Sequence, residues 1–435
     1  MNGAPVMSNV KRIFVATAAA AVLGVTVQSA SAFQLAGRWP GAQGDATTLT
    51  WSILPDGTPI TGFNGEPDSP SNLVSQFRSF YGVTHADPAA ATADTDYTDE
   101  AWFGQMKSSF DRWSSVSGLS LTYQANDDGS TFLTSPGSAT RGDIRIGGHT
   151  IDGPGVVLAY NYLPNFGDGV IDTADNFGPA SQGNDSRKLR NLVAHEVGHG
   201  LGLLHTEGIA NNLLNRTTSS NPPFDGPQLD DILGIQRHYG DANEKGAGND
   251  TTGTATNLGA LASGVPVAIG ADAVDQEVGR YETDFVSIDS ATDTDVFMFT
   301  VGADGMLTAL LDPLGPTQRF GKAGDSTLYD YAAFGDLTVE LLDAGGSVIA
   351  WDNDGLLGAG EELTDIALLA GDYFIRIGGA DFVDLGGDST AQFYGLSLAF
   401  TEEAETEPPV SVSEPGMAIL FLMSIGAIGL RRRKK

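Results

Sequence analysis

The sequence predicts two folded domains: a mixed α/β domain over residues 33–240 and an all-β sandwich over residues 249–400. In the first region, apolar residues at helical spacing stand between strand-like runs, which indicates helices packed on a sheet. In the second region, short runs with alternating apolar residues are broken by Gly and Asp, a pattern typical of a β-sandwich. A polar, glycine-rich linker, residues 241–248, separates the two domains.

The first domain begins with a predicted strand, TTLTWSIL (residues 47–54), and its next element is a long amphipathic helix in DEAWFGQMKSSFDRWSSVSG (residues 99–118). Two more strands follow, LSLTYQA (residues 119–125) and DIRIGG (residues 143–148). The aromatic stripe of the helix is expected to belong to the core. Its members, at helical spacing, are Trp102, Met106, Phe110 and Trp113.

The second domain is expected to be built from strands alone, because its apolar runs are short and follow period 2. An insertion around residues 317–333 interrupts their spacing. The strand-like runs are DVFMFTV (295–301), LTALL (307–311), LTVELLDAGGSVIAW (337–351), DYFIRIGG (372–379) and YGLSLAF (394–400).

The composition excludes several kinds of function. A net charge of −32 argues against nucleic-acid binding, because a phosphate backbone would be repelled. The same charge fits either simple solubility or binding of divalent cations by clustered carboxylates. The chain has no cysteine, so disulfides, thiol catalysis and cysteine-ligated zinc are excluded, and any zinc must use His and carboxylates.

Both ends of the chain look like export signals. Residues 1–32 combine Lys11-Arg12, an apolar run and a small-residue site ending at Ala32, as in a secretory signal peptide. An acidic linker, residues 401–413, leads to residues 414–435, where a short apolar stretch precedes five basic residues. This tail resembles the bacterial PEP-CTERM sorting signal, which implies processing by an exosortase; a C-terminal membrane anchor is the alternative. We expect a bacterial protein that is secreted or held at the cell surface.

Residues 195–205 read HEVGHGLGLLH and contain three of the six histidines in the chain. On a helix, positions i and i+4 share one face, so His195 and His199 can offer their imidazoles to one ion. Gly202 can end the helix and turn the chain, because glycine accepts a positive φ, and His205 then returns as a third ligand. Three protein ligands leave a fourth position for water, as catalytic zinc requires. We therefore predict a helix that binds zinc.

The pattern H-E-x-x-H-x-x-G-x-x-H is that of the metzincin metalloendopeptidases, and residues 38–240 resemble the matrixins, the matrix metalloprotease family. The resemblance implies a metzincin-like domain with a mixed sheet and a zinc helix. The other stretches that carry it are LTWSI (49–53), FDRWSSVSGLSLTY (110–123), GDIRIGG (142–148), DGPGVVLAY (152–160) and LDDILGIQRHYG (229–240).

The matrixin resemblance implies a secreted zinc-dependent endopeptidase that hydrolyses peptide bonds of extracellular proteins. Glu196 would be the catalytic base, which takes a proton from the zinc-bound water and passes it to the leaving amine. The alternative is a non-catalytic surface or matrix-binding protein that retains the metzincin fold. Glu196 favours the enzyme, because a binding module has no need of a base beside the metal.

Two departures from the family pattern affect the expected site. Metzincins carry a methionine below the zinc, and this chain has Leu213 at that place, an apolar residue of similar volume. Matrixins also bind a second, structural zinc through several histidines. Tyr160 and Val170 occupy two of those places, so we predict that this zinc is absent and that His149 is a surface or packing residue.

Matrixins also bind calcium between a glycine loop and downstream acids, and carboxylates and carbonyls on glycine turns are ligands that Ca²⁺ selects. Acidic turns without an ion are the alternative. The substrate is expected to lie along residues 156–162 as an added strand, with Val157, Leu158, Ala159 and Tyr160 in contact, beside a pocket walled by residues 214–227. The calcium candidates are Asp152, Gly153, Gly155, Val157, Asp172 and Asp175.

Residues 249–400 resemble the bacterial pre-peptidase C-terminal domain, a β-sandwich appended to secreted peptidases. The resemblance rests on NDTTGTATNLG (249–259) and on the strand-like runs named above. Attachment to a cell surface or a polysaccharide, or stabilisation and secretion, are the roles it implies. Four aspartates, Asp293, Asp295, Asp352 and Asp354, are either calcium ligands or exposed turn residues.

Overall fold

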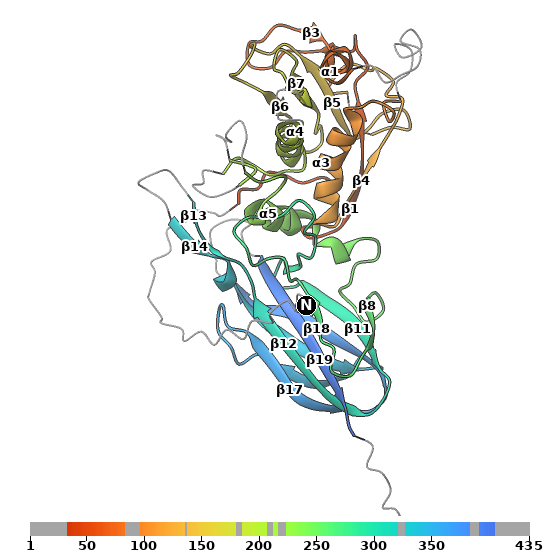
Figure 1. The fold of residues 1–435 in the computed structure, drawn as a ribbon, viewed down its shortest axis with the longest axis vertical. Helices are drawn as coiled ribbons and strands as arrows, with labels where there is room; N and C mark the ends of the chain where they lie inside the picture. The colour runs from red at the N-terminus through yellow and green to blue at the C-terminus, as the bar shows by residue number, and fades with distance from the viewer. Residues whose placement is uncertain are drawn as a thin grey trace, which may run out of the picture.

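The structure is a computed structural model that describes residues 33–82, 96–134, 137–179, 185–206, 212–215, 223–320, 327–382 and 391–404. It contains the two predicted domains, and helix α5 (Leu229–Tyr239) lies between them (Figure 1). The expected signal peptide and the expected sorting tail lie outside the described residues. Within the described residues, no helix is long and apolar enough to cross a membrane.

The first domain is a mixed five-stranded sheet of strand order β4-β1-β5-β7-β6. Strands β4, β1, β5 and β7 run parallel to one another, and β6 pairs antiparallel with β7 at the edge. This confirms the predicted α/β class. The strands are β1 (Thr47–Ile53), β4 (Leu119–Tyr123), β5 (Ile144–His149), β6 (Ala159–Asn161) and β7 (Gly169–Asp172), with a small hairpin of β2 (Pro59–Ile60) and β3 (Ser69–Pro70) and the helices α1 (Leu73–Tyr81), α3 (Phe103–Ser115) and α4 (Arg187–Gly200).

Helix α3 joins the sheet to α4 through its buried face. The aromatic stripe predicted for it is fully buried, as expected. The ring of Phe110 stacks on Trp51 of β1, with ring centroids 4.1 Å apart. On the α4 side, Trp113 Nε1 donates to the Ala194 carbonyl at 2.9 Å, and Ser109 Oγ donates to the Arg190 carbonyl at 2.9 Å. The core thus sets the position of α4, which carries the first two motif histidines.

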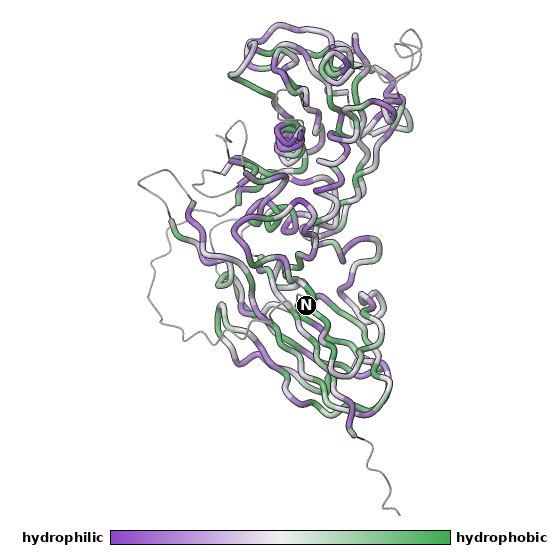
Figure 2. Tube along the Cα trace, viewed as in Figure 1, coloured by the Kyte–Doolittle hydropathy of each residue, from purple (hydrophilic) through white to green (hydrophobic). Residues whose placement is uncertain are grey.

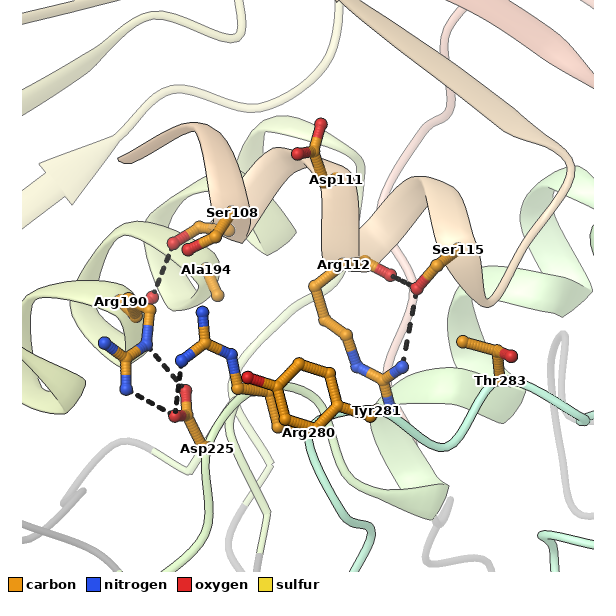
Figure 3. Close-up of a pocket in the computed structure, with 12 residues that line it drawn as sticks. Ser108, Asp111, Arg112, Ser115, Arg190, Ala194, Asp225, Arg280, Tyr281 and Thr283 are labelled. Atoms are coloured by element: carbon orange, nitrogen blue, oxygen red, sulfur yellow. Dashed lines mark hydrogen bonds and ion pairs between the residues drawn. The ribbon is translucent and has the colours of Figure 1, made fainter. Parts of the chain in front are cut away.

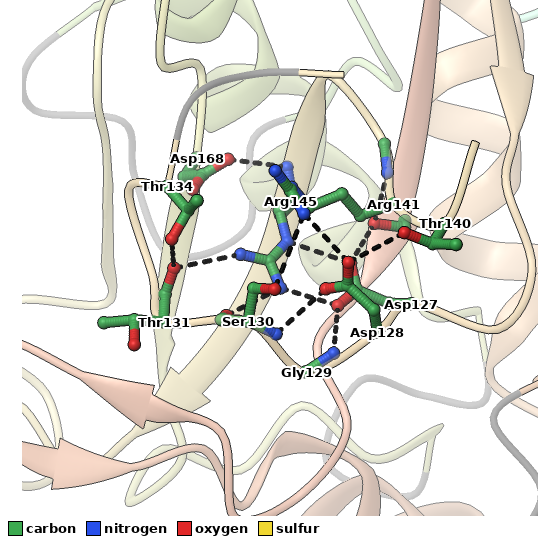
Figure 4. A network of polar contacts seen from close by, with 12 residues as sticks. Asp127, Asp128, Gly129, Ser130, Thr131, Thr134, Thr140, Arg141, Arg145 and Asp168 are labelled. Carbon is green, nitrogen blue, oxygen red and sulfur yellow. Dashed lines mark hydrogen bonds and ion pairs between the residues drawn. The ribbon is translucent and has the colours of Figure 1, made fainter. Parts of the chain in front are cut away.

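A buried ion pair holds the loops at one end of the sheet (Figure 4). The Arg145 guanidinium donates to both carboxylate oxygens of Asp127, at 2.9 and 2.6 Å, and Arg145 is fully buried. Asp168, from the segment before β7, accepts the backbone N–H groups of Arg145 and Leu133. These contacts tie the loop before β5 and the segment before β7 to the sheet, because Arg145 lies on β5 and its partners Asp127 and Asp168 come from those two segments.

The second domain is a β-sandwich of two five-stranded sheets, which confirms the all-β prediction. One sheet has the order β10-β19-β12-β17 with β9 on β19, and the other has β16-β15-β18-β11-β8. Figure 2 shows the hydrophobic residues along these strands. The strands are β8 (Thr256–Leu261), β9 (Val267–Ile269), β10 (Ser287–Ile288), β11 (Thr294–Val301), β12 (Gly305–Pro313), β15 (Gly335–Asp343), β16 (Val348–Asp352), β17 (Glu361–Leu368), β18 (Gly371–Phe382) and β19 (Gln392–Glu402).

The insertion noted in the sequence forms a small separate unit on the sandwich. It consists of the hairpin β13 (Thr317–Phe320) and β14 (Thr327–Asp330), followed by the 3-10 helix η3 (Tyr331–Ala333). Figure 1 shows the hairpin beside α5, while η3 packs against β19, where Gln392 Nε2 donates to the Tyr331 carbonyl. This unit therefore contributes to the contact between the domains.

The two domains share one hydrophobic cluster around α5, which we call the interdomain cluster. Gln228, the residue before α5, exchanges hydrogen bonds with the backbone of Val278 in the sandwich, and Gln236 Nε2 donates to the Phe285 carbonyl at 3.1 Å. Apolar contact of this size makes a fixed arrangement of the domains the expectation. The buried members are Phe33, Val116, Leu229, Ile232 and Leu233 of the first domain and Ala273, Val278, Phe285, Tyr329, Tyr331, Phe334, Ala391 and Phe393 of the sandwich.

Candidate metal centre

The end of α4 directs the chain back toward its own last turn. The helix ends at Gly200, and Gly202 follows with a φ of +105°, a conformation that glycine adopts without strain. A Cβ atom at Gly202 would lie 2.5 Å from the Gly37 carbonyl oxygen, so the close packing of the turn also requires glycine. The turn brings His205 beside the two histidines of the helix.

The Nε2 atoms of the three motif histidines converge on one point. His205 Nε2 lies 3.1 Å from His195 Nε2 and 3.2 Å from His199 Nε2. The other ring nitrogens of the two helical histidines face carbonyls: His195 Nδ1 lies 2.6 Å from Leu213 O, and His199 Nδ1 lies 2.7 Å from Leu203 O. Donation from Nδ1 to these carbonyls leaves both Nε2 atoms as acceptors aimed at the same point. A cation satisfies such a set, and the residues present therefore fit zinc.

Burial keeps this group in the form that binds metals. Desolvation lowers the pKa of His195 to about 3, with a smaller contribution from the neighbouring His199, and burial also lowers the pKa of His199. Neutral imidazole is the ligand form of histidine. Burial alone raises the pKa of Glu196 to about 8, and a nearby cation would restore the charged carboxylate.

The floor of the centre is a short loop, residues 212–215, held by α5. Leu213 is fully buried. Its N–H donates to Asp231 Oδ2 at 2.8 Å, and the N–H of Leu214 donates to Asp231 Oδ1 at 3.0 Å. Asp231 also closes a capping box with Gln228 at the start of α5. Sequence reasoning placed Asp231 in the stretch that resembles the matrixins but gave it no role, and Gln228 and Asp231 do not match the usual S/T-x-x-E/Q pattern of a capping box.

The predicted calcium residues come together in one loop cluster, but their carboxylates are engaged with backbone groups. Asp172 accepts the N–H groups of Asp152, Gly153 and Ala174, and Asp152 accepts that of Val157. Asp175 Oδ2 is buried and has no hydrogen-bond partner among the described residues, and burial raises the Asp175 pKa. Among the described residues, these three aspartates are not one of the groups whose ligand atoms lie within 4.8 Å of one another.

The predicted substrate strand lies at the open edge of the sheet. Strand β6 pairs with β7 on one side and, within the described residues, with no strand on the other. Val157 is exposed and Leu158 and Ala159 are partly exposed, whereas the hydroxyl of Tyr160 bonds to Glu66. Part of the expected specificity wall, residues 216–222, lies outside the described residues.

His149 is a packing residue in a buried network with Glu66 and Tyr160. Its exposed fraction is 1%. His149 Nδ1 lies 3.3 Å from the Ser69 carbonyl, and His149 Nε2 lies 3.3 Å from Glu66 Oε1, which also accepts the Tyr160 hydroxyl at 2.5 Å. Val170, the other departure from the zinc pattern, is fully buried beside this network.

Two of the four sandwich aspartates belong to an acidic cluster at the junction of the domains. Asp295 is fully buried, so it is not an exposed turn residue, and its carboxylate lies within 4.8 Å of those of Asp241 and Glu244. Asp293 groups in the same way with Glu244 and Asp250. Burial raises the pKa of Asp241 to about 7 and that of Glu244 to about 9. Asp352 and Asp354 form another such group with Glu361.

A cavity of about 260 Å³ lies between α3, α4 and residues 280–283 of the sandwich (Figure 3). Arg190 and Arg280 face Asp225 there, at 2.5 and 3.7 Å from its Oδ2. Arg112 reaches from α3 to carbonyls of the sandwich loop. None of the three motif histidines is among the residues that line this cavity, so it is separate from the metal centre.

Comparison with known proteins finds similarities to part of the chain. Residues 89–240 match the family model described as Matrixin. The chain is 31% identical to the hatching enzyme of Paracentrotus lividus over 163 residues, which are 38% of this chain and 26% of that protein. It is 28% identical to matrix metalloproteinase-20 of Homo sapiens, with 43% and 35% covered, and 31% identical to the interstitial collagenase of Bos taurus, with 37% and 31% covered. The chain thus spans between a quarter and about a third of the length of these relatives.

A solved structure aligns with about a third of the chain. It is the pre-peptidase C-terminal domain of collagenase from Bacillus anthracis, at 14% identity and a TM-score of 0.20. The alignment covers 33% of this chain and 93% of that domain.

Proposed function

We propose that the chain is a zinc-dependent endopeptidase that hydrolyses peptide bonds of extracellular proteins. The convergence of the Nε2 atoms of His195, His199 and His205 carries this proposal, because it brings three imidazole nitrogens to one point. Glu196 follows the first of them in the helix. The matrixin match of residues 89–240 supports the same reaction.

The three histidines would hold the zinc, which supplies a Lewis acid and lowers the pKa of a water when bound. Glu196 then takes the proton of the attacking water and delivers it to the leaving amine. Strand β6 offers its free edge to the substrate, whose main chain pairs there as an added strand. Val157, Leu158, Ala159 and Tyr160 are the residues proposed for that contact.

Hydrolysis of casein by residues 33–404, compared with the variant Glu196→Gln, tests this function. We expect about 10²- to 10⁴-fold slower hydrolysis in the variant, because the general base is lost, with one zinc bound per chain in both proteins. Equal hydrolysis by both proteins would refute the role of Glu196. Zinc in both without hydrolysis in either would favour the alternative, a non-catalytic surface or matrix-binding protein.

We also propose calcium as a structural cofactor. The glycine loop of Asp152, Gly153, Gly155, Val157, Asp172 and Asp175 is one candidate, supported by the unsatisfied Asp175 Oδ2. The junction cluster of Asp241, Glu244 and Asp295 is another, supported by Asn249 Oδ1 and Ser287 Oγ, two buried oxygens for which the described part of the chain offers no hydrogen-bond partner. Oxygen-rich sites of this kind suit Ca²⁺. Calcium-independent thermal stability of the chain would contradict this proposal.

Export is proposed from the residues at the two ends of the chain alone. Residues 1–32 would be removed as a signal peptide, and residues 414–435 would be processed by an exosortase-type protease or would anchor the protein. The domains would then span residues 33–240 and 249–400, with attachment to a cell surface or polysaccharide as one role for the second. Mass spectrometry of the exported protein tests both cleavages, and an intact N-terminus would contradict the first.

A further inference from the structure

Tyr331 of the sandwich reaches into the first domain and contacts α5. It is fully buried, and its hydroxyl donates to Asp230 Oδ1 at 2.6 Å. Gln392 holds its backbone, because Gln392 Nε2 donates to the Tyr331 carbonyl at 2.8 Å. The ring packs against Phe334, with centroids 5.1 Å apart. The Tyr331 side chain is therefore fixed by the sandwich and presented to the helix.

Asp230 transmits this contact to the loop below the metal centre. Its second oxygen, Oδ2, accepts from Asn212 Nδ2 at 3.0 Å. Asn212 also forms hydrogen bonds with two other residues. Its Nδ2 donates to Thr206 Oγ1 at 2.5 Å, and its Oδ1 accepts the N–H of Leu214 at 2.9 Å. All four residues lie in the interior, so water does not replace these bonds.

Two parts of the chain lie next to the proposed zinc ligands: the loop of residues 212–215 and Thr206. Thr206 follows His205 directly, and its N–H donates to the Leu214 carbonyl at 3.0 Å. The neighbouring Leu213 carbonyl is the acceptor for His195 Nδ1. A path of hydrogen bonds thus runs from the sandwich to His195 and to Thr206 beside His205, and so reaches two of the three proposed zinc ligands. Partners of this kind orient the ligands of a metal, and their loss typically costs 10- to 100-fold in metal affinity or activity.

We propose that Tyr331 is a positioning residue of the metal centre and that the sandwich is thereby part of the enzyme's machinery. This inference rests on the proposed zinc endopeptidase function. The insertion of residues 317–333 supplies the contact, since η3 begins at Tyr331. The hydroxyl donor stabilises the buried Asp230 carboxylate, and Asp230 holds Asn212 in the orientation that closes the loop on the ligands.

The test is Tyr331→Phe, which removes one hydroxyl and no carbon. Tyr373→Phe is the control, because it likewise removes one hydroxyl from the sandwich, and the Tyr373 hydroxyl donates to the Leu369 carbonyl at 2.9 Å, a contact that involves no residue of α5 or of the junction cluster. Three quantities are measured for each protein: zinc affinity by competition with a chromophoric chelator, kcat and KM on a peptide, and the thermal unfolding midpoint.

We expect Tyr331→Phe to bind zinc about 10-fold more weakly or to lose kcat by that factor, with KM unchanged; this is the low end of the range for a direct partner of a metal ligand, because Tyr331 acts through Asp230 and Asn212. Tyr373→Phe should keep the parent's zinc affinity and kcat. Parent-like zinc affinity and kcat in Tyr331→Phe would overturn the proposal. Equal losses in both variants would also overturn it, because they would follow from lowered stability. A parent that binds zinc without hydrolysis would refute the proposed function and leave the affinity comparison decisive.

A second variant checks the path itself. Asn212→Ala interrupts the same chain of bonds two links further on, so its effect on zinc affinity is expected to overlap with that of Tyr331→Phe. The double variant should then lose less affinity than the product of the two separate losses. A loss equal to that product would show that the two residues act independently, contrary to the proposal.

Discussion

The interdomain cluster predicts that a change in the sandwich destabilises the first domain. Phe285 is 1% exposed in the sandwich, and its carbonyl accepts Gln236 of α5. Replacing a buried Phe by Ala costs about 3–5 kcal/mol through lost transfer energy and the cavity left behind. If α5 unfolds with the sandwich, the same free energy of unfolding is lost by the whole chain.

Tryptophan fluorescence can report on the first domain alone. Of the five tryptophans, Trp351 is in the sandwich and is 67% exposed, so Trp351→Phe should change stability by less than about 0.5 kcal/mol. The remaining four then report urea unfolding of the first domain. At a slope of about 3 kcal/mol per M urea, Phe285→Ala should lower the midpoint by about 1–2 M.

An unchanged fluorescence midpoint would refute this reasoning, provided that circular dichroism shows the sandwich itself to be destabilised. That outcome would mean that the domains unfold independently and that the apolar contact at α5 is dispensable. Met306→Ala is the control, because Met306 is 41% exposed on β12 and its truncation leaves no cavity. It should change the midpoint little.

Three further predictions concern charge and backbone. In excess chelator, the thermal unfolding midpoint should fall as the pH rises from 5 to 9. In the folded chain Asp241 and Glu244 have pKa values of about 7 and 9 and stay protonated over much of this range. In the unfolded chain their pKa values are about 4, so they are already ionised, and raising the pH therefore favours unfolding. Excess calcium should reduce that fall, as calorimetry at each pH can check; a flat profile in chelator would contradict the burial argument. Arg145→Met should lower the free energy of unfolding by about 3–5 kcal/mol, as chemical denaturation can measure, because Asp127 is left buried without its counter-charge. A decrease below about 1 kcal/mol would be inconsistent with the network. Gly202→Ala should lower both stability and bound zinc, because the residue has a φ of +105°; full zinc content in a stable variant would show that the turn adapts.

The contacts at the junction of the domains hold the sandwich against α5, which its strand pattern did not predict. The expected linker, residues 241–248, contributes two acids to the junction cluster with Asp295, and α5 lies against both domains. A flexible tether would leave these groups in water. Cation binding at the junction and the Tyr331 contact would act together, since both hold the sandwich against α5.

The helix with the two motif histidines and the cores of both domains were predictable from the sequence, because each depends on local spacing. His195 and His199 are one helical turn apart, and Gly202 with His205 completes the ligand set within six further residues. The aromatic stripe of α3 and the alternating residues of the sandwich strands likewise show which face of each element is buried. Such periodicity is a property of the element itself and needs no knowledge of its partner.

Only the tertiary structure decided what each buried face meets and which polar groups pair across the chain. Asp230 looked like part of a family signature in the last helix, yet its partners are Asn212 and Tyr331, the latter 101 residues away. Asp295 stood in a turn-like sequence, and the packing of the junction buried it among other acids. Sequence spacing determines the chemistry offered by neighbours along a helix or strand. Contacts between distant segments depend on how whole elements pack, which no local pattern encodes.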